Sequence, residues 1–258
     1  MPTVLEILSK TEEFFAQKGV PSPRTDAQLL LAHALRCKRL ELFLRFDRPL
    51  GEGELAEVRE LVRRRGKREP LQHILGSQEF FGASIKCDAR ALIPRPETEE
   101  LCEIISEKLF PDSGAPLGIL DLGTGSGAIA VALALRYPNA RVDAVDKSAP
   151  ALELARENAA SNGARVGFAE SDWFGNAGEG YDLVVSNPPY LTEEEVAGAE
   201  PEVREHDPIS ALVSPDGGMA DLKKILFGAA RRLNPGGILA LECGLGPVSY
   251  THLTLPTT

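Results

Sequence analysis

Cysteine and histidine are scarce in this sequence, and neither residue is clustered. The four cysteines show no C-x-x-C spacing, and the four histidines lie apart from them and from one another. This scatter is unfavourable for a disulfide framework or a structural zinc site. We therefore expect no bound metal and a reducing compartment.

Long apolar runs are also absent. No uninterrupted apolar stretch approaches the roughly 18 residues of a membrane span. The N-terminal segment MPTVLEILSKTEEF has mixed charge rather than the basic start and apolar centre of a signal peptide. The sequence therefore predicts a cytoplasmic protein without membrane association, and we expect it to be a monomer.

Positive charge is in short supply over most of the chain. Residues 1–75 carry 14 Lys and Arg against 11 Asp and Glu, whereas the remainder carries 14 against 27. Because nonspecific affinity for nucleic acid comes mainly from Lys and Arg, direct nucleic-acid binding is disfavoured for so acidic a region. The basic run RRRGKR at 63–68 could contact RNA, although a solvated helix end is the favoured interpretation.

The pattern of apolar residues divides the chain into a helical part and an α/β part. Apolar residues recur at helical spacing in the N-terminal part of the chain, which predicts a small helical bundle. Short β-prone stretches around Gly82 and Asp88 then indicate a hairpin. The predicted domains are a helical domain over 1–75, a β-hairpin linker over 76–95 and a larger domain over 96–244.

The larger domain alternates between strand-like and helix-like segments. A helix begins at Pro96 and ends near Phe110. The later segments are strands at 119–122, 141–146, 165–170, 181–186 and 237–242, and helices at 127–137, 150–162 and 218–233. Such alternation is typical of the α/β class, with a doubly wound, mostly parallel sheet that carries helices on both faces.

The end of the chain does not fit this pattern. The stretch GPVSYTHLTLPTT has no charged residue and no amphipathic period. A sheet that stopped at the apolar strand before it would leave that strand as an edge, which natural sheets usually protect. We therefore interpret residues 245–258 as a non-native tail and the larger domain as C-terminally truncated.

A glycine-rich turn follows the first expected strand of the larger domain. In the segment DLGTGSGA, which begins at Asp121, glycines let the backbone approach a ligand, and the helix that follows offers unpaired N–H groups. Asp146 ends the next strand, where a carboxylate can accept both hydroxyls of a ribose. The turn also satisfies the dinucleotide fingerprint G-x-G-x-x-A, and a turn that serves only strand–helix packing is the alternative.

A second motif, Asn187-Pro188-Pro189-Tyr190, directly follows the apolar strand YDLVVS. In an open parallel sheet it would lie on the same edge as the glycine turn. The lone pair of an amide or ring amino nitrogen is delocalised, so attack on a methyl sulfonium develops positive charge on that nitrogen. The Asn187 side-chain oxygen and the Pro188 carbonyl could hold its N–H groups and stabilise this charge. Tyr190 could pack on the planar acceptor, and the alternative is an ordinary proline-rich turn.

Together these motifs resemble the release-factor glutamine methyltransferase (PrmC/HemK) family. The resemblance extends to about residue 243 and departs from the family pattern at Asp207-Pro208, where Glu-Pro is expected. The matching segments are ALIPRPETEEL (91–101), ILDLGTGSGAIA (119–130), AVDKS (144–148), SDWF (171–174), SNPPYL (186–191) and GGMADLKKI (217–225).

The resemblance implies a class I S-adenosylmethionine-dependent methyltransferase, with a Rossmann-like fold joined by a hairpin to a helical domain that recognises the partner. The implied reaction moves a methyl group from S-adenosyl-L-methionine to N5 of the glutamine in the Gly-Gly-Gln motif of peptide chain release factors, the proteins of translation termination. S-adenosyl-L-homocysteine is the product, and no metal takes part.

The resemblance also implies the site residues. The cofactor-binding residues are Gly123, Thr124, Gly125, Ser126, Gly127, Asp146, Trp173 and Asn187; the catalytic residues are Asn187, Pro188 and Tyr190; and the substrate-binding residues are Asn187, Pro188, Pro189 and Tyr190. Trp173 would border the adenine, and a role as a core anchor is equally favoured. For Arg95 and Glu97, a proline-started helix with an acidic first turn is the favoured interpretation.

Three other functions compete with this one. A nucleic-acid methyltransferase of the adenine N6 type would present the same kind of planar nitrogen to the Asn-Pro-Pro-Tyr motif, but such enzymes usually need a basic surface. A nicotinamide-dependent dehydrogenase would use the glycine turn and leave that motif unexplained. A non-enzymatic cofactor-binding adaptor is the third.

Overall fold

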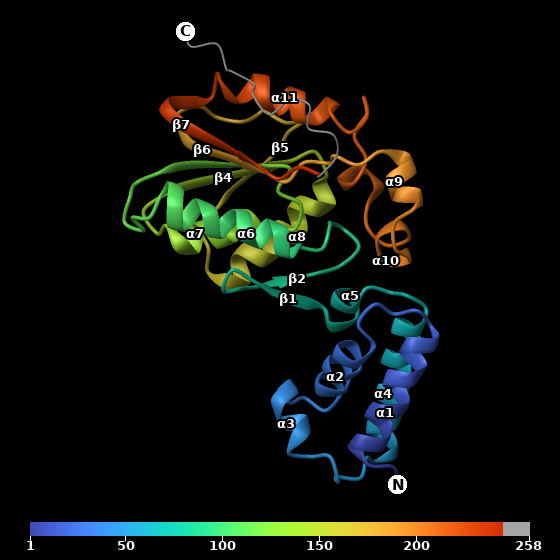
Figure 1. Ribbon diagram of the computed structural model, residues 1–258. Helices are drawn as coiled ribbons and strands as arrows, with labels where there is room; N and C mark the ends of the chain where they lie inside the picture. Colours follow the sequence, from blue (N-terminus) through green and yellow to red (C-terminus); the bar gives the residue numbers. More distant parts are fainter. Residues whose placement is uncertain (245–258) are drawn as a thin grey trace. The chain divides into compact units, whose positions relative to one another are not determined.

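The structure, a computed structural model, describes residues 1–244 (Figure 1). These residues divide into two compact units: residues 1–76 with 200–206, and residues 77–199 with 207–244. Each unit has a hydrophobic core of its own. The predicted non-native tail, and with it the predicted truncation, lies outside the described residues. None of the described helices is long and apolar enough to span a bilayer.

The first unit is a helical bundle, as the sequence predicts. Its helices are α1 (Val4–Gln17), α2 (Pro23–Ala34), α3 (Arg39–Phe43), α4 (Glu52–Gly66), α5 (Leu71–Leu75) and α10 (Pro201–Arg204). A reciprocal capping box begins α1, because Thr3 Oγ1 accepts from the Glu6 N–H and the Glu6 carboxylate accepts from the Thr3 N–H. Val4, Leu8 and Phe15 bury one face of α1 in the core. The short helices α3, α5 and α10 carry too few turns to show a periodicity, and the sequence did not predict them.

The basic run at 63–68 is partly buried within this unit. The side chain of Arg65 is 5% exposed; its Nε donates to Asp26 Oδ2 at 2.8 Å and its Nη1 to Glu202 Oε1 at 2.7 Å. Arg68 Nε donates to the same Glu202 oxygen at 2.7 Å. The interpretation of this run as a solvated helix end is therefore wrong for these two arginines, because acidic partners far away in the sequence draw them into the unit.

The second unit is built on a five-stranded parallel sheet. Its strands are β3 (Gly118–Leu122), β4 (Arg141–Asp146), β5 (Gly167–Glu170), β6 (Tyr181–Ser186) and β7 (Leu233–Leu241), in the order β5-β4-β3-β6-β7. The chain winds from β3 outward through β4 to β5 and then returns to the other side of β3 with β6. All five residues of β3 are buried, as expected of a central strand covered on both faces. The predicted α/β fold class is confirmed.

Helices cover both faces of this sheet (Figure 1). The helices that cover it are α6 (Pro96–Ile104), which continues as the π-helical segment η1 (Ile105–Leu109), then α7 (Ala128–Arg136), α8 (Ala149–Asn162) and α11 (Ala220–Ala229). The unit also contains α9 (Glu193–Ala197) and the short 3-10 helix η2 (Ile209–Ala211). Side chains alternate along β3, so Ile119 lies in the core formed with α6 and α7. Leu120 and Leu122 lie in the opposite core, which α11 covers.

A two-stranded hairpin, β1 (Ser77–Phe80) and β2 (Ala83–Lys86), lies where the sequence predicts one. Phe81 and Gly82, the two residues of its turn, both have positive φ, which is the conformation of the type I′ turns that match strand twist. Side chains of α8 hold β2, since Asn158 Oδ1 accepts from the Lys86 N–H at 2.8 Å and Asn162 Oδ1 from the Ser84 N–H at 3.0 Å.

The last helix and strand differ from their predicted bounds. The helix expected over 218–233 is α11, which ends at Ala229, and the strand expected from 237 begins at Leu233. The reason is an irregularity in the pairing of β7 with β6 after Leu233, at the sequence Asn-Pro-Gly-Gly. Proline and glycine are typical of turns, so this bulged part of the strand is invisible to a periodicity argument.

Candidate active site

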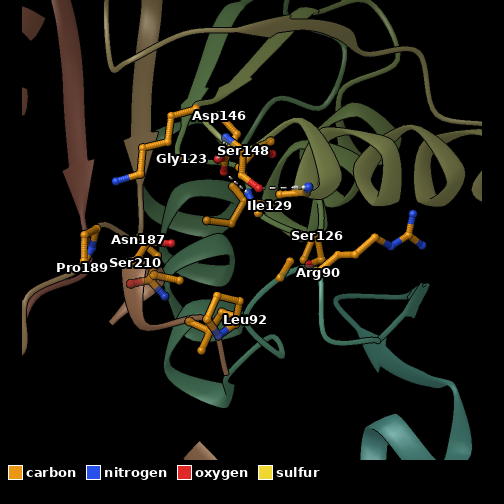
Figure 2. A pocket seen from close by; sticks show the side chains of 18 of the residues that line it. Arg90, Leu92, Gly123, Ser126, Ile129, Asp146, Ser148, Asn187, Pro189 and Ser210 are labelled. Atoms are coloured by element: carbon orange, nitrogen blue, oxygen red, sulfur yellow. Dashed lines mark hydrogen bonds between the residues drawn. The ribbon is translucent and has the colours of Figure 1, made fainter. Parts of the chain in front are cut away.

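A pocket opens at the carboxyl ends of β3, β4 and β6. Gly123 follows β3, Asp146 ends β4 and Asn187 follows β6, and all three line the pocket (Figure 2). The order of strands reverses between β3 and β6, and open parallel sheets bind ligands at such a point. The topology thus brings together the two motifs that the sequence singled out.

The glycine turn between β3 and α7 has a different task at each glycine. Gly123 and Gly125 line the pocket, with φ of 68° and 56°, a conformation that other residues adopt only with strain. A Cβ atom at Gly123 would lie 3.4 Å from the Trp173 ring. Gly127 does not line the pocket; a Cβ there would lie 2.9 Å from Cβ of Ala155 in α8. Gly127 therefore lets α7 approach α8, whereas the first two glycines shape the pocket wall.

Asp146 is tied to this turn through both of its carboxylate oxygens. Oδ2 accepts from the Gly125 N–H at 2.9 Å, and Oδ1 accepts from the Ser148 N–H at 2.8 Å. Each carboxylate oxygen has capacity for a further hydrogen bond. Asp146 therefore positions the turn and can still accept hydroxyl groups from a ligand in the pocket.

A second carboxyl group, that of Asp121, lies buried beneath the turn. It is 0% exposed, and its Oδ2 accepts from Thr124 Oγ1 at 2.6 Å. Burial raises the pKa of Asp121 to about 7; the Thr124 hydroxyl and the Ala130 N–H lower it, and the charge of Asp146 raises it further. The hydrogen bond between Asp121 and Thr124 fixes the start of the turn from within the protein.

Asn158 of α8 supports the turn from its other side. The residue is buried, and its Nδ2 donates to the carbonyl of Ser126 at 2.8 Å while its Oδ1 holds β2. One carboxamide thus joins the hairpin, α8 and the pocket wall. Nothing in its local sequence distinguishes this asparagine from any other in a helix, so its role could not be predicted from the sequence.

Trp173 lies both at the pocket and in a hydrophobic core, the two surroundings that the sequence left open. It lines the pocket, and it also packs against the core that α11 covers. Its Nε1 donates to Asp221 Oδ1 at 3.1 Å, and Asp221 Oδ2 accepts from Ser214 at 2.8 Å. The indole ring is therefore fixed at the wall of the pocket beside Gly123.

The Asn-Pro-Pro-Tyr motif reaches the pocket through two of its four residues. Asn187 and Pro189 line it, whereas Pro188 and Tyr190 do not. The Tyr190 hydroxyl instead donates to Glu242 Oε1 at 3.2 Å. Burial, with the neighbouring Glu242 carboxylate, raises the pKa of Tyr190 to about 12, so the phenol keeps its proton at neutral pH.

The Asn187 side chain is held in place by a hydrogen bond to a residue of the pocket wall. Its Nδ2 donates to Thr98 Oγ1 at 3.0 Å, and the Thr98 hydroxyl donates to Glu242 Oε2 at 2.6 Å. Thr98 lies in the first turn of α6, and Glu242 directly follows β7. Neither residue was expected at the site from the sequence.

A further wall of the pocket comes from the segment between the hairpin and α6. Residues 90–95 all line it; Figure 2 shows Arg90 and Leu92 there. Arg95 Nη2 donates to Asp207 Oδ2 at 2.6 Å, and Pro208 also lines the pocket. Arg95 does precede the proline that starts α6, as interpreted from the sequence, but its side chain belongs to the pocket as well. The segment ALIPRPETEEL was the available signal.

The chemistry of the lining residues favours binding and orientation over acid–base catalysis. The lining residues described include neither histidine nor cysteine. Over residues 1–244, no three His, Cys, Asp or Glu side chains lie close enough together to hold a metal ion. What the pocket offers is backbone from the glycine turn, the Asp146 carboxylate, an aromatic ring and the Asn187 carboxamide. This set suits a nucleoside-containing ligand placed against a second, planar polar group.

Comparison with known proteins assigns both parts of the chain. The family model described as the PrmC N-terminal domain matches residues 6–76, and the model described as the methyltransferase small domain matches residues 102–200. Among curated relatives, the release factor glutamine methyltransferase of Geobacter sulfurreducens is 42% identical over 245 residues, covering 95% of this chain and 85% of the relative. The enzyme of the same name from Chlorobaculum tepidum is 45% identical, covering 93% and 85%. That from Rhodopirellula baltica is 41% identical, covering 93% and 83%.

Proposed function

Because this chain belongs to the release factor glutamine methyltransferase family, we propose that it transfers a methyl group from S-adenosyl-L-methionine to N5 of the glutamine in the Gly-Gly-Gln motif of peptide chain release factors. The observation that carries the proposal is a single pocket. It joins a glycine turn and a carboxylate, suited to a nucleoside, to an asparagine carboxamide suited to a planar amide.

The chemical types of the pocket residues suit the cofactor. Asp146 would accept the ribose hydroxyls, and the turn from Gly123 to Ser126 would line the methionine portion. Trp173 would border the adenine. When bound, S-adenosyl-L-methionine supplies an electrophilic methyl group on a sulfonium.

The Asn-Pro-Pro-Tyr motif would seat the acceptor amide. Asn187 Oδ1 would accept one of its N–H groups, and the carbonyl of Pro188, a residue adjacent to the pocket lining, would accept the other and so orient the nitrogen toward the methyl group. The amide nitrogen would carry positive charge as it accepts the methyl group, and the two oxygens would stabilise that charge. The nitrogen would then lose a proton to water. Pro189 would close the pocket around the amide, and Tyr190 would hold the motif against Glu242.

The two units suggest a division of labour. The residues proposed for the cofactor all lie in the second unit, and the PrmC N-terminal match lies in the first. We therefore assign partner recognition to a helical domain over 1–75, followed by a hairpin linker over 76–95 and a methyltransferase domain over 96–244. Release factors act in translation, so the proposed site of action is the cytoplasm.

Labelled S-adenosyl-L-methionine tests this proposal directly. The protein is incubated with intact release factor, ribosomal RNA or adenine-containing DNA as separate acceptors. We expect label only in the release factor, and mass spectrometry should place it on the glutamine of Gly-Gly-Gln. Transfer to either nucleic acid, with none to the factor, would establish the adenine N6 alternative in its place.

Replacing Asn187 tests the chemistry. Asn187→Ala removes an acceptor that faces developing charge, so kcat should fall by about 10²–10³, while affinity for the cofactor falls much less. Single-turnover methylation and calorimetry measure the two effects. Asn139→Ala is the matched control, because the Asn139 carboxamide also donates one hydrogen bond, to the carbonyl of Gly114, but Asn139 does not line the pocket. An Asn187→Ala variant as fast as the parent protein would reduce Asn187 to a turn residue.

A further inference from the structure

The series of hydrogen bonds behind Asn187 has a direction, and two of its members, Thr98 and Glu242, have no assigned part in the reaction. It runs from Asn187 Nδ2 to Thr98 Oγ1 at 3.0 Å and from the Thr98 hydroxyl to Glu242 Oε2 at 2.6 Å. The other oxygen, Glu242 Oε1, accepts from the Tyr190 hydroxyl at 3.2 Å. Thr98 itself is only 4% exposed, so water has little access to its hydroxyl.

The protons of this chain can be placed by counting donors. An ionised carboxylate only accepts, and a threonine hydroxyl has one proton and two lone pairs. The Thr98 proton must therefore point to Glu242, which leaves only lone pairs facing Asn187. The group of Asn187 that meets Thr98 must then be its NH₂ group, because its oxygen would meet another oxygen without a proton between them. The Asn187 oxygen is consequently turned away from Thr98.

We propose that Glu242 and Thr98 are positioning residues that fix the orientation of the Asn187 carboxamide, so that Oδ1 rather than Nδ2 faces the acceptor. The inference rests on the proposed function, in which Oδ1 holds an N–H of the acceptor amide. An asparagine amide is nearly symmetric in shape, so packing alone does not distinguish its two orientations. A flipped Asn187 would present N–H groups to the acceptor nitrogen and would oppose the charge that develops there.

These hydrogen bonds connect three parts of the fold to Asn187. Thr98 comes from α6, Glu242 from the end of β7 and Tyr190 from the Asn-Pro-Pro-Tyr motif itself. The Glu242 carboxylate accepts from both hydroxyls, which holds it in place between α6 and the motif. Asn187, a pocket residue seen in Figure 2, is thereby held by Thr98, which also lines the pocket, and by Glu242, which does not.

Thr98→Val tests the proposal at its central residue. Valine has nearly the shape of threonine but cannot accept from Asn187, so kcat should fall roughly tenfold, the order of one lost hydrogen bond. The KM for S-adenosyl-L-methionine should be unchanged, and Thr98→Ser should restore kcat. Thr11→Val is the matched control, since Thr11 is a buried threonine of α1 outside the pocket. If Thr98→Val keeps the parent kcat, the orienting role is refuted.

A stricter test reverses the direction of the hydrogen bonds that join positions 187, 98 and 242. In Asn187→Asp, an oxygen replaces Nδ2 and faces the lone pairs of Thr98. In Glu242→Gln, Tyr190 still requires an acceptor, so the new NH₂ group faces Thr98 and turns the Thr98 proton toward Asn187. Each single variant should lower the melting temperature and reduce kcat about tenfold or more. The double variant restores a consistent chain, in which the introduced glutamine donates to Thr98 and the Thr98 hydroxyl donates to the introduced aspartate, and it should recover most of both losses.

The two readouts separate this inference from the proposed function. Recovery of the melting temperature in the double variant supports the directional chain whether or not methyl transfer is observed. If the losses of the two single variants simply add in the double variant, in both melting temperature and kcat, the proposed direction of the hydrogen bonds is refuted. A parent protein that binds the cofactor but transfers no methyl group to the Gly-Gly-Gln glutamine would overturn the proposed function alone.

Discussion

Asp146 gives a sharp test of the cofactor site, because the structure shows it in two roles. Its carboxylate accepts from the N–H groups of Gly125 and Ser148 at 2.9 and 2.8 Å and also lines the pocket. Asp146→Ala removes the proposed acceptor of the ribose hydroxyls and at the same time releases the glycine turn. Asp146→Asn is not a conservative change, since one of its two positions becomes an NH₂ group that faces a backbone N–H.

The size of the effect follows from the hydrogen bonds involved. A hydrogen bond to a charged group contributes about 1.5–3 kcal/mol, and a factor of ten in affinity corresponds to about 1.4 kcal/mol. Because Asp146→Ala removes the charged acceptor of two ribose hydroxyls, it should raise the Kd for the cofactor at least tenfold, even where water replaces part of the interaction. Loss of order in the turn adds to this. We expect Asp146→Asn to bind nearly as weakly as Asp146→Ala.

Calorimetric titration with S-adenosyl-L-homocysteine measures this affinity without turnover. Glu170→Ala is the matched control: Glu170 ends β5, pairs in register with Asp146 and does not line the pocket. The control should bind like the parent protein. Unchanged affinity in an Asp146→Ala variant that melts like the parent would remove Asp146 from the site and refute the reasoning.

Two further predictions concern stability. Arg65→Ala leaves the buried Asp26 carboxylate without its partner and removes one of the two arginines that hold Glu202, so it should cost about 3–5 kcal/mol in urea unfolding. The exposed pair Arg63–Glu60 is the control, and an equal loss in Arg63→Ala would contradict the argument. Burial raises the pKa of Asp121 from 3.8 to about 7, so the folded state binds the Asp121 proton more tightly than the unfolded state does. The protonated carboxyl therefore adds to the free energy of unfolding below about pH 4, and this contribution is lost as the pH rises to about 7. Asp121→Asn cannot titrate, so its stability relative to the parent should rise by up to roughly 4 kcal/mol over that range; a difference independent of pH would contradict the raised pKa.

The sheet and the edge that binds the ligand could be predicted from the sequence because both depend on local patterns. The apolar runs of β3 and β6 and the turns after them identify the strands and their carboxyl ends. Parallel topology then brings Gly123, Asp146 and Asn187 to one edge without any knowledge of side-chain contacts. The strand β7 is the exception, since a bulge with Pro and Gly interrupts its pattern.

The residues that hold the site could not be predicted in the same way. Thr98 meets Asn187 and Glu242 across separations of 89 and 144 residues, and Asn158 meets Ser126 across 32. Each is a common residue type in a helix, where a solvent-exposed role is the ordinary expectation. Only the tertiary structure shows that these polar side chains are buried and paired.

The same reasoning applies to the charged residues of the first unit. The predicted helical domain is continuous over 1–75, whereas the first unit also takes in residues 200–206. Glu202 accounts for part of this grouping, because it accepts from both Arg65 and Arg68. A run of arginines and a distant glutamate each appear ordinary in the sequence, and their pairing follows only from the fold.

Asp207 illustrates how a departure from the family pattern can leave the site intact. The sequence has Asp-Pro where Glu-Pro is expected, and aspartate is shorter by one methylene group. Its carboxylate nevertheless accepts from Arg95 Nη2 at 2.6 Å, with the Asp207 side chain only 1% exposed. Arg95 and Pro208 both line the pocket, so this ion pair fixes two of its walls to each other. The Arg95 side chain therefore has to extend further to meet the shorter Asp207 side chain, while the ion pair between the two walls is kept.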